Sequence, residues 1–99
     1  MAAELIIASA AEEDVDLAVR WYEEQRAGVG AQFLQQFRAC TKRIANSPEM
    51  HAVIAGDYRR AMLRQFPYAV FYEFINDTVT IYAVLHTARD STVWQSRIE

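Results

Sequence analysis

The stretch YAVFYEFINDTVTIYAVLH, residues 68–86, decides the fold class of this 99-residue chain. Its two halves are rich in aromatic and β-branched side chains, which favour strands. Asn76 and Asp77 separate the halves, and these residue types suit a two-residue hairpin turn. The stretch therefore predicts two antiparallel strands, and residues 59–64 predict a third strand of the same meander.

The two predicted strands differ in how their apolar side chains alternate. Residues 78–86 predict one core face and one aromatic, partly polar face; the core set is Val79, Ile81, Ala83 and Leu85. Residues 68–75 are apolar on both sides, and so short a chain has few elements left to cover a second sheet face. Two alternatives remain for what covers the second sheet face: the C-terminal turn with Trp94, or a segment of a partner protein.

The N-terminal third predicts a strand followed at once by a helix. Residues 4–8 form a short aliphatic run, and Ser9 and Glu12 have the spacing of a capping box. Apolar side chains then recur every three or four residues as far as Tyr22, which is typical of one buried helix face. Gly28 is expected to end this helix in the left-handed conformation.

A second helix is predicted from Gly30 to the Asn46-Ser47-Pro48 stop, since apolar residues again follow helical spacing. The short link between the helices implies an antiparallel hairpin. Near the end of the chain, Asp90 or Ser91 is expected to cap a short helical turn.

These elements predict a single α+β domain over residues 1–99. The expected order is an N-terminal strand, a two-helix antiparallel hairpin on one face of a small, mainly antiparallel sheet, and a short C-terminal helical turn. Hydrophobic residues make up 53% of the chain and charged residues 23%, which is ordinary globular usage. A single domain of this length can bury one core without disulfide or metal staples.

Composition also limits the compartment and the chemistry. Cys40 is the sole cysteine, so no internal disulfide is possible, and its helical position favours a small core residue. The first residues lack the basic start and long apolar run of an export signal, so we expect a cytoplasmic protein with no membrane association. Neither His51 nor His86 has metal-ligand spacing, and the glycines form no phosphate loop, so no metal or cofactor is expected.

Three segments resemble the RelE/ParE-type toxins of type II toxin-antitoxin, or plasmid stabilisation, systems. They are DLAVRWYEEQRAGVGAQFL at residues 16–34, RRAMLRQFPYAVFY at 59–72 and VLHTARD at 84–90. Their order and spacing carry the resemblance over nearly the whole chain. It implies a toxin held inactive by a cognate antitoxin, whose extended or helical C-terminal region wraps it and would cover the apolar surface.

Members of this superfamily divide mainly into ribonucleases that cut mRNA in the ribosomal A site and ParE-like proteins that poison DNA gyrase. Cleavage of RNA needs a proton acceptor and cations at the phosphate. The candidates for these catalytic roles are His86, Arg60, Arg64 and Arg89. In the resemblance, however, Met62 stands in place of a catalytic lysine, Ala69 in place of a catalytic arginine, and Trp94 near a C-terminal tyrosine.

The sequence therefore favours a ParE-like, non-enzymatic toxin that acts on a protein target such as gyrase. The chain carries a net charge of −3, which does not help binding to a ribosome. A RelE-type mRNA endonuclease that uses ribosome and mRNA is the alternative, and a decayed, non-toxic binding member is a third. The residues expected to contact antitoxin or target are Arg59, Arg60, Tyr68, Tyr72, Tyr82 and Trp94.

These residues also have purely structural interpretations. The arginines of residues 59–64 can be solvated charges that discourage pairing at a strand edge. His86 can be a hydrogen-bonded residue at the end of a strand, and Arg89 with Asp90 can order the C-terminus locally. The sequence does not separate these interpretations.

Overall fold

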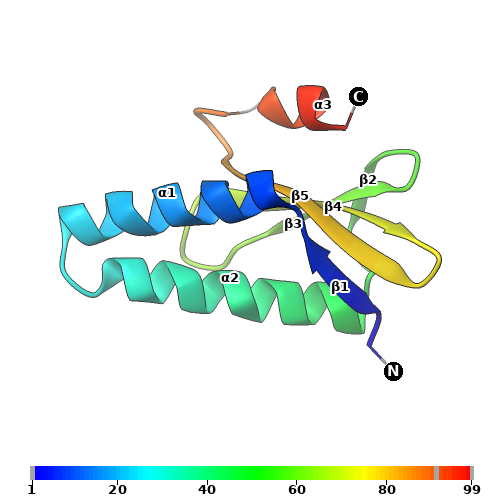
Figure 1. Ribbon diagram of the computed structural model, residues 1–99, viewed down its shortest axis with the longest axis horizontal. Helices are drawn as coiled ribbons and strands as arrows, with labels where there is room; N and C mark the ends of the chain where they lie inside the picture. The colour runs from blue at the N-terminus through cyan, green and yellow to red at the C-terminus, as the bar shows by residue number, and fades with distance from the viewer. Residues whose placement is uncertain (1, 91, 99) are drawn as a thin grey trace.

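The computed structural model describes residues 2–90 and 92–98, which form five strands and three helices (Figure 1). In chain order they are β1 (Glu4–Ile7), α1 (Ser9–Gln25), α2 (Val29–Asn46), β2 (Ala52–Ala55), β3 (Tyr58–Met62), β4 (Tyr68–Ile75), β5 (Thr78–His86) and α3 (Val93–Arg97). The strands form one sheet in the order β1-β5-β4-β3-β2, in which β1 is parallel to β5 and the other pairs are antiparallel. The predicted α+β architecture is confirmed.

The β4–β5 hairpin has the bounds and the turn that the sequence predicts. Asn76 and Asp77 have φ of 50° and 61°, so both central residues of the turn are left-handed. Such a turn matches the twist of the flanking strands, and Asn and Asp tolerate this conformation better than other side chains.

A bulge interrupts the pairing of β4 with β5. Phe71 lies opposite Ala83, whereas the next residue, Tyr72, lies opposite Ile81. Tyr82 is therefore the extra residue of β5, with no partner in β4. An extra residue changes the side to which the following side chains point.

The bulge makes one prediction wrong. Val79 and Ile81 face the two long helices, but beyond the bulge it is Val84 that faces them. Ala83 and Leu85 lie on the opposite side of the sheet, in a separate apolar cluster. The four residues predicted to share one core face are thus divided between both faces, because the period of two holds only within an uninterrupted ladder.

The edge of the sheet beyond β4 also differs from the prediction. β3 covers Tyr58–Met62 instead of residues 59–64, so Arg64 lies in the loop that leads to β4. Gln65 in this loop has a φ of 71°, which ends the extended conformation. β2, a four-residue edge strand that pairs with β3 across the turn at Gly56, was not predicted from the sequence.

The start of α1 differs from the predicted capping box. Ala8 is the N-cap residue and makes no side-chain capping bond, while Ser9 is the first residue inside the helix. The backbone N–H of Ala8 donates to the carbonyl of Ile81 at 2.9 Å. This bond ties the end of β1 to β5, so the chain turns into the helix one residue earlier than the cap pattern requires.

The link between the helices is held by an acidic side chain and two glycines. α1 ends at Gln25, and Gly28, with a φ of 92°, is the N-cap of α2 and not the stop of α1; α2 then begins at Val29 and not at Gly30. The Glu23 carboxylate accepts bonds from the N–H groups of Gly28 and Gly30 at 3.0–3.1 Å, which satisfies free donors at the start of α2. A Cβ on Gly30 would lie 2.6 Å from the carbonyl oxygen of Val19, so glycine permits the close helix contact.

The helical hairpin covers one face of the sheet, called the helix side here, and the main core lies between them (Figure 1). Phe33 is fully buried there, and its ring contacts the rings of Tyr22, Phe66 and Tyr68 at centroid distances of 4.9–5.6 Å. Other buried members are Val15, Phe37, Ile44, Val70 and Tyr72. Cys40 is buried in this core, as predicted.

The short C-terminal helix forms as predicted, with different capping. α3 begins at Val93 with Thr92 as the N-cap residue and without a side-chain capping bond. The Asp90 carboxylate instead accepts the backbone N–H of His86 at 3.2 Å, and Ser91 lies outside the described residues. None of the helices in the described residues is long and apolar enough to cross a membrane.

Candidate functional site

The side of the sheet opposite to α1 and α2, called the second face here, is partly covered by the C-terminal helix. Its buried cluster consists of Ala69, Phe71, Ala83 and Leu85. Trp94 of α3 stacks on Phe71 with 5.7 Å between ring centroids and 11° between ring planes. The chain thus supplies its own cover for this part of the second face.

The rest of the second face carries a tyrosine pair. The hydroxyl of Tyr82 donates to Oε1 of Glu73 at 3.1 Å, and the ring of Tyr58 lies 5.6 Å from that of Tyr82. Burial, reinforced by this bond to a carboxylate, raises the pKa of Tyr82 to about 12. Tyr82 therefore remains a neutral hydroxyl at physiological pH, and its side chain is half-buried.

Two of the nuclease candidates meet at a small cleft beside α3. The cleft has a volume of about 70 Å³, and its lining includes Arg60, His86, Asp90 and Trp94. His86 is not free to rotate there, because its Nδ1 accepts the backbone N–H groups of Ala88 and Arg89, both at 3.1 Å. Nδ1 is the acceptor nitrogen of the neutral ring, so the ring hydrogen lies on Nε2, which can donate a hydrogen bond into the cleft.

The other two nuclease candidates lie elsewhere. Arg89 donates to the hydroxyl of Tyr68 at 3.0 Å, and its guanidinium carbon lies 5.4 Å from the centre of the Trp21 ring on α1. Arg64 lies in the β3–β4 loop on the side of Cys40, whose pKa is raised by burial although Arg43 and Arg64 oppose that shift. The structure therefore brings together Arg60 and His86 but not the full predicted set.

The residues predicted to bind a partner are also divided. Tyr68 and Tyr72 are buried on the helix side, where the Tyr72 hydroxyl donates to the carbonyl of Pro48 at 2.7 Å. Arg59 donates from Nη1 to the carbonyls of Glu49 and His51, at 3.1 and 2.9 Å, and so orders the segment before β2. The remaining three lie on the second face or at its cleft; they are Arg60, Tyr82 and Trp94.

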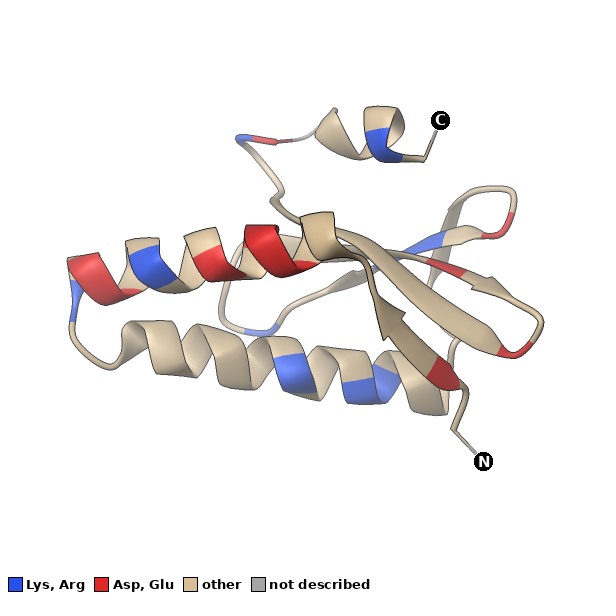
Figure 2. Ribbon diagram, viewed as in Figure 1, with Lys and Arg blue, Asp and Glu red and all other residues tan. Residues whose placement is uncertain are grey.

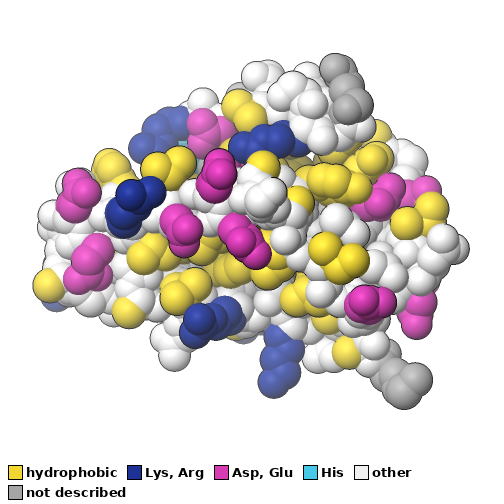
Figure 3. All heavy atoms as spheres, in the orientation of Figure 1, with side chains coloured by type: hydrophobic (Ala, Val, Ile, Leu, Met, Phe, Trp, Pro, Cys, Tyr) yellow, Lys and Arg dark blue, Asp and Glu magenta, His cyan; other side chains and the backbone are white. Residues whose placement is uncertain are grey.

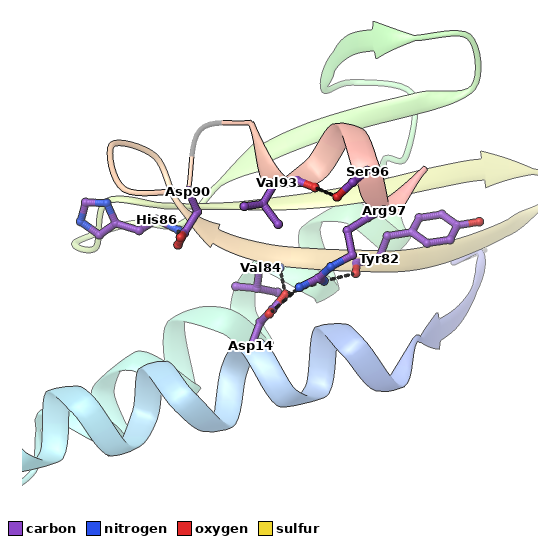
Figure 4. A network of polar contacts seen from close by, with 8 residues as sticks. All are labelled: Asp14, Tyr82, Val84, His86, Asp90, Val93, Ser96 and Arg97. Carbon is purple, nitrogen blue, oxygen red and sulfur yellow. Dashed lines mark hydrogen bonds and ion pairs between the residues drawn. The ribbon is translucent and has the colours of Figure 1, made fainter. Parts of the chain in front are cut away.

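A polar network that the sequence does not reveal closes the free edge of β5 (Figure 4). β1 pairs only with residues 78–81 of β5, so among the described residues the second half of that strand has no neighbouring strand on this side. Asp14 of α1 accepts the Val84 N–H at 3.0 Å, while Nη1 of Arg97 donates to the Tyr82 carbonyl at 3.0 Å. Side chains thus satisfy the backbone groups that a further strand would pair with.

Asp14 and Arg97 also bind each other in a bidentate ion pair, with two N–O distances of 3.0 Å. Their side chains are 11% and 26% exposed. Hydrogen bonding to Asp14 raises the pKa of the Arg97 guanidinium above its usual range, although burial opposes this. The pair joins α1 to α3 across 83 residues of sequence, which is why no local pattern predicts it.

An open groove runs between α1 and the segment that follows β5, and is called the α1 groove here. Its volume is about 430 Å³, and the Asp14–Arg97 pair lies in its lining. The remaining lining residues are Leu17, Ala18, Trp21, Tyr68, Val84, Leu85, Arg89, Asp90 and Val93. The groove therefore combines an apolar interior with two arginines and two carboxylates.

Residues 5–91 match the family described as the ParE toxin of the type II toxin-antitoxin system, parDE. The chain belongs to the ParE toxin family. The resemblance seen in the sequence is confirmed, and the ParE-family toxin has a cognate antitoxin as its implied partner.

Two solved structures share the fold of this ParE-family toxin. The chromosomal ParDE system from P. aeruginosa has a TM-score of 0.75 at 14% identity, over 85% of this chain and 95% of that chain. The E. coli toxin RelE, as a double arginine-to-alanine mutant in the free state, has a TM-score of 0.65 at 18% identity, over 99% and 96%. No curated protein sequence matches the chain significantly.

Within the described residues, no group of three or more His, Cys, Asp or Glu side chains is placed to hold a metal ion. The expectation of a protein without metal or cofactor stays a prediction.

Proposed function

We propose that this ParE-family toxin acts in the cytoplasm on a protein target, DNA gyrase, and is neutralised by its cognate antitoxin. The observation that carries the proposal is the chemistry of the second face. Met62 and Ala69 lie opposite each other in the β3–β4 ladder, and Trp94 packs onto the adjoining cluster. An apolar surface of this kind suits a protein contact better than it suits phosphate chemistry.

The geometry of the arginines supports the same proposal. Stabilising a developing phosphorane charge needs cations gathered around one phosphate. Arg60 stands at the cleft with His86, but Arg89 is held by Trp21 and Tyr68, and Arg64 is in another loop. The charge distribution agrees, because α1 carries six acidic side chains and one basic, which disfavours approach of a nucleic-acid polyanion (Figure 2).

A ribosome-dependent mRNA endonuclease is the second candidate, since Arg60 and His86 line one cleft. In this mechanism Arg60 would bind the phosphate and His86 would accept a proton. Accepting a proton requires Nδ1 to release the N–H groups of Ala88 and Arg89, because Nε2 carries the ring hydrogen. The mechanism also requires α3 and Trp94 to leave room for the substrate, because the cleft holds about 70 Å³.

Expression of the toxin gene without antitoxin tests the proposal. We expect growth arrest with a DNA-damage response, and inhibition of supercoiling when purified toxin is added to gyrase. Arrest with intact chromosomes and cleaved transcripts would contradict a gyrase target. Harmless expression of folded protein would favour a non-toxic binding member of the family.

A matched pair of variants separates the two candidates. His86→Asn keeps an acceptor near the position of Nδ1 for the Ala88 and Arg89 N–H groups, but it cannot exchange a proton. Its toxicity should equal that of the parent if gyrase is the target, and should be lost if the protein is a nuclease. His51→Asn serves as the control, because His51 does not line the cleft.

A further inference from the structure

A second groove lies on the outer surface of the helical hairpin, between α1 and α2, and is called the hairpin groove here. Its volume is about 290 Å³, and it shares no lining residue with the α1 groove. Its lining residues are Ile7, Glu12, Val15, Asp16, Leu34, Phe37, Arg38 and Thr41. Ile7 and Leu34 are half-buried, so the groove presents apolar surface between the two helices.

The two walls of the hairpin groove carry opposite charges. Glu12 and Asp16 of α1 lie on one wall and Arg38 of α2 on the other, and all three are exposed. Within residues 2–90 and 92–98, no nitrogen of Arg38 lies within 4.0 Å of a carboxylate oxygen. The groove therefore keeps its acidic and basic side chains apart. Figure 3 shows the resulting surface, with acidic side chains over α1, hydrophobic surface between the helices and basic side chains over α2.

A surface with this order of rows is complementary to a second copy of itself. A two-fold axis that runs along the groove, parallel to the helices, places the α1 of one copy against the α2 of the other. This rotation does not shift residues along the groove, so Glu12 and Asp16 stay level with the Arg38 of the other copy. A two-fold axis across the helices would instead bring acid against acid, so the charges select one arrangement.

We propose that the hairpin groove is the interface of a homodimer of this toxin. Glu12 and Asp16 of each copy pair with Arg38 of the other, and the two Leu34 side chains fill the space between the facing grooves. The same contacts occur twice, because the arrangement is symmetric. The proposal does not depend on which cellular target the toxin inhibits.

The size of the face sets the strength of this dimer. A helix of 17 residues is about 26 Å long, and two helices packed about 10 Å apart form a face of about 500 Å². Stable complexes bury about 800 Å² on each partner. The homodimer is therefore weak and reversible, with a dissociation constant of about 10–100 µM.

Sedimentation velocity of the purified full-length toxin, from about 5 to 500 µM, measures this association. We expect monomers at the lowest concentration and dimers at the highest. The dissociation constant should rise about tenfold in about 1 M NaCl, because salt screens exposed ion pairs. A toxin that stays monomeric at every concentration, or a dimer that salt leaves unchanged, would overturn the proposal.

Two charge-reversal variants assign the interface to the hairpin groove. Arg38→Glu makes both walls acidic, and Glu12→Arg combined with Asp16→Arg makes both walls basic. Each variant alone should dimerise at least about tenfold more weakly than the parent, because like charges then face each other. The substituted side chains are exposed, so the fold is kept.

Mixing these two variants in equal amounts should restore association, since an acidic face then meets a basic one. Arg64→Glu is the matched control, because it makes the same change of charge at an exposed position between β3 and β4 and should dimerise like the parent. The proposal fails if Arg38→Glu dimerises like the parent or if the mixed variants do not associate. It also fails if the toxin stays monomeric and its Leu34 amide NMR signal shifts only on addition of the cognate antitoxin.

Discussion

The two faces of the sheet differ greatly in how much of each is covered by helices. On the helix side, Phe33 and Ile44 of α2 and Tyr72 of β4 are completely buried between the sheet and two helices of 17 and 18 residues. On the second face, four buried residues lie beneath a helix of five residues, none of which is itself buried. A helix this short is marginal without tertiary contacts. The helix side therefore contains most of the buried core, and α3 is the less extensive cover of the sheet.

Apolar side chains are visible beneath α3 and along the helical hairpin, between the charged side chains of α1 and α2 (Figure 3). α1 and α2 also differ in charge, because α2 carries Arg38, Lys42 and Arg43 and no acidic residue (Figure 2). A partner that crosses both helices would meet surfaces of opposite sign.

The largest expected loss of stability follows from a substitution in the core of the helix side. Phe33→Ala should lower the free energy of unfolding by about 4 kcal/mol, because a fully buried ring leaves a cavity between rigid elements. Phe71→Ala on the second face should cost about 2–3 kcal/mol, since α3 can settle into the gap. Urea denaturation measures both values. Equal losses would mean that the second face is as rigid as the helix side.

A pH-dependent loss of stability should also come from the helix side. Burial raises the pKa of Tyr72 to about 12 in the folded protein, above the value near 10 of an unfolded tyrosine. The folded state therefore holds this proton longer, so stability is fully present below pH 10 and is lost as the pH rises to about 12.

Urea denaturation at pH 9 and at pH 11.5 measures this effect against a matched variant. Tyr72→Phe lacks the hydroxyl, so its stability should fall less over this interval than that of the parent. The variant also loses the bond to Pro48, which lowers its stability equally at both pH values. A parallel decline of the two proteins would contradict the assignment to Tyr72.

Breaking the Asp14–Arg97 ion pair, which joins α1 to α3, should lower the free energy of unfolding by an intermediate amount. Asp14→Asn keeps an acceptor for the Val84 N–H but removes the charge opposite Arg97, and we expect a loss of about 1–2 kcal/mol for this partly buried pair. Arg97→Gln added to it should cost little more, because the two residues act together. Additive losses in a double-mutant cycle would show that the pair is not coupled.

The smallest loss of stability is expected on replacing Trp94 of α3, which covers part of the second face. Trp94→Ala should cost about 1 kcal/mol, since it removes the stack on Phe71 from a half-buried helix. Trp94→Phe should recover most of this loss because it can still stack. A loss above 3 kcal/mol would contradict the view that α3 is a weakly held cover.

Sequence pattern predicted elements well where the period of the side chains is unbroken. The β4–β5 hairpin and its Asn76-Asp77 turn follow from local preferences, and so does the helical hairpin. The capping box failed because the sheet fixes Ala8, and the end of β3 failed because Gln65 turns the chain. β2 was missed because its four residues carry too short a signal.

The candidate site was less predictable from sequence than the fold. Arg60, His86 and Trp94 were predicted as catalytic or partner-binding residues, and all three line one cleft. Tyr68 and Tyr72 were grouped with them, but strand alternation places these tyrosines in the core. Which of these residues contacts antitoxin or target stays a prediction.

Local periodicity and motifs along the chain are enough to predict the α+β class, the order of the elements other than β2, and the family resemblance. Which face each side chain occupies depends on the folded sheet. One extra residue at Tyr82 divides a predicted core face between two sides of the sheet. The pairing of Asp14 with Arg97 and the contact of Arg89 with Trp21 likewise depend on packing between residues far apart in sequence. Such contacts leave no local pattern, since their energy depends on where the folded layers bring the side chains.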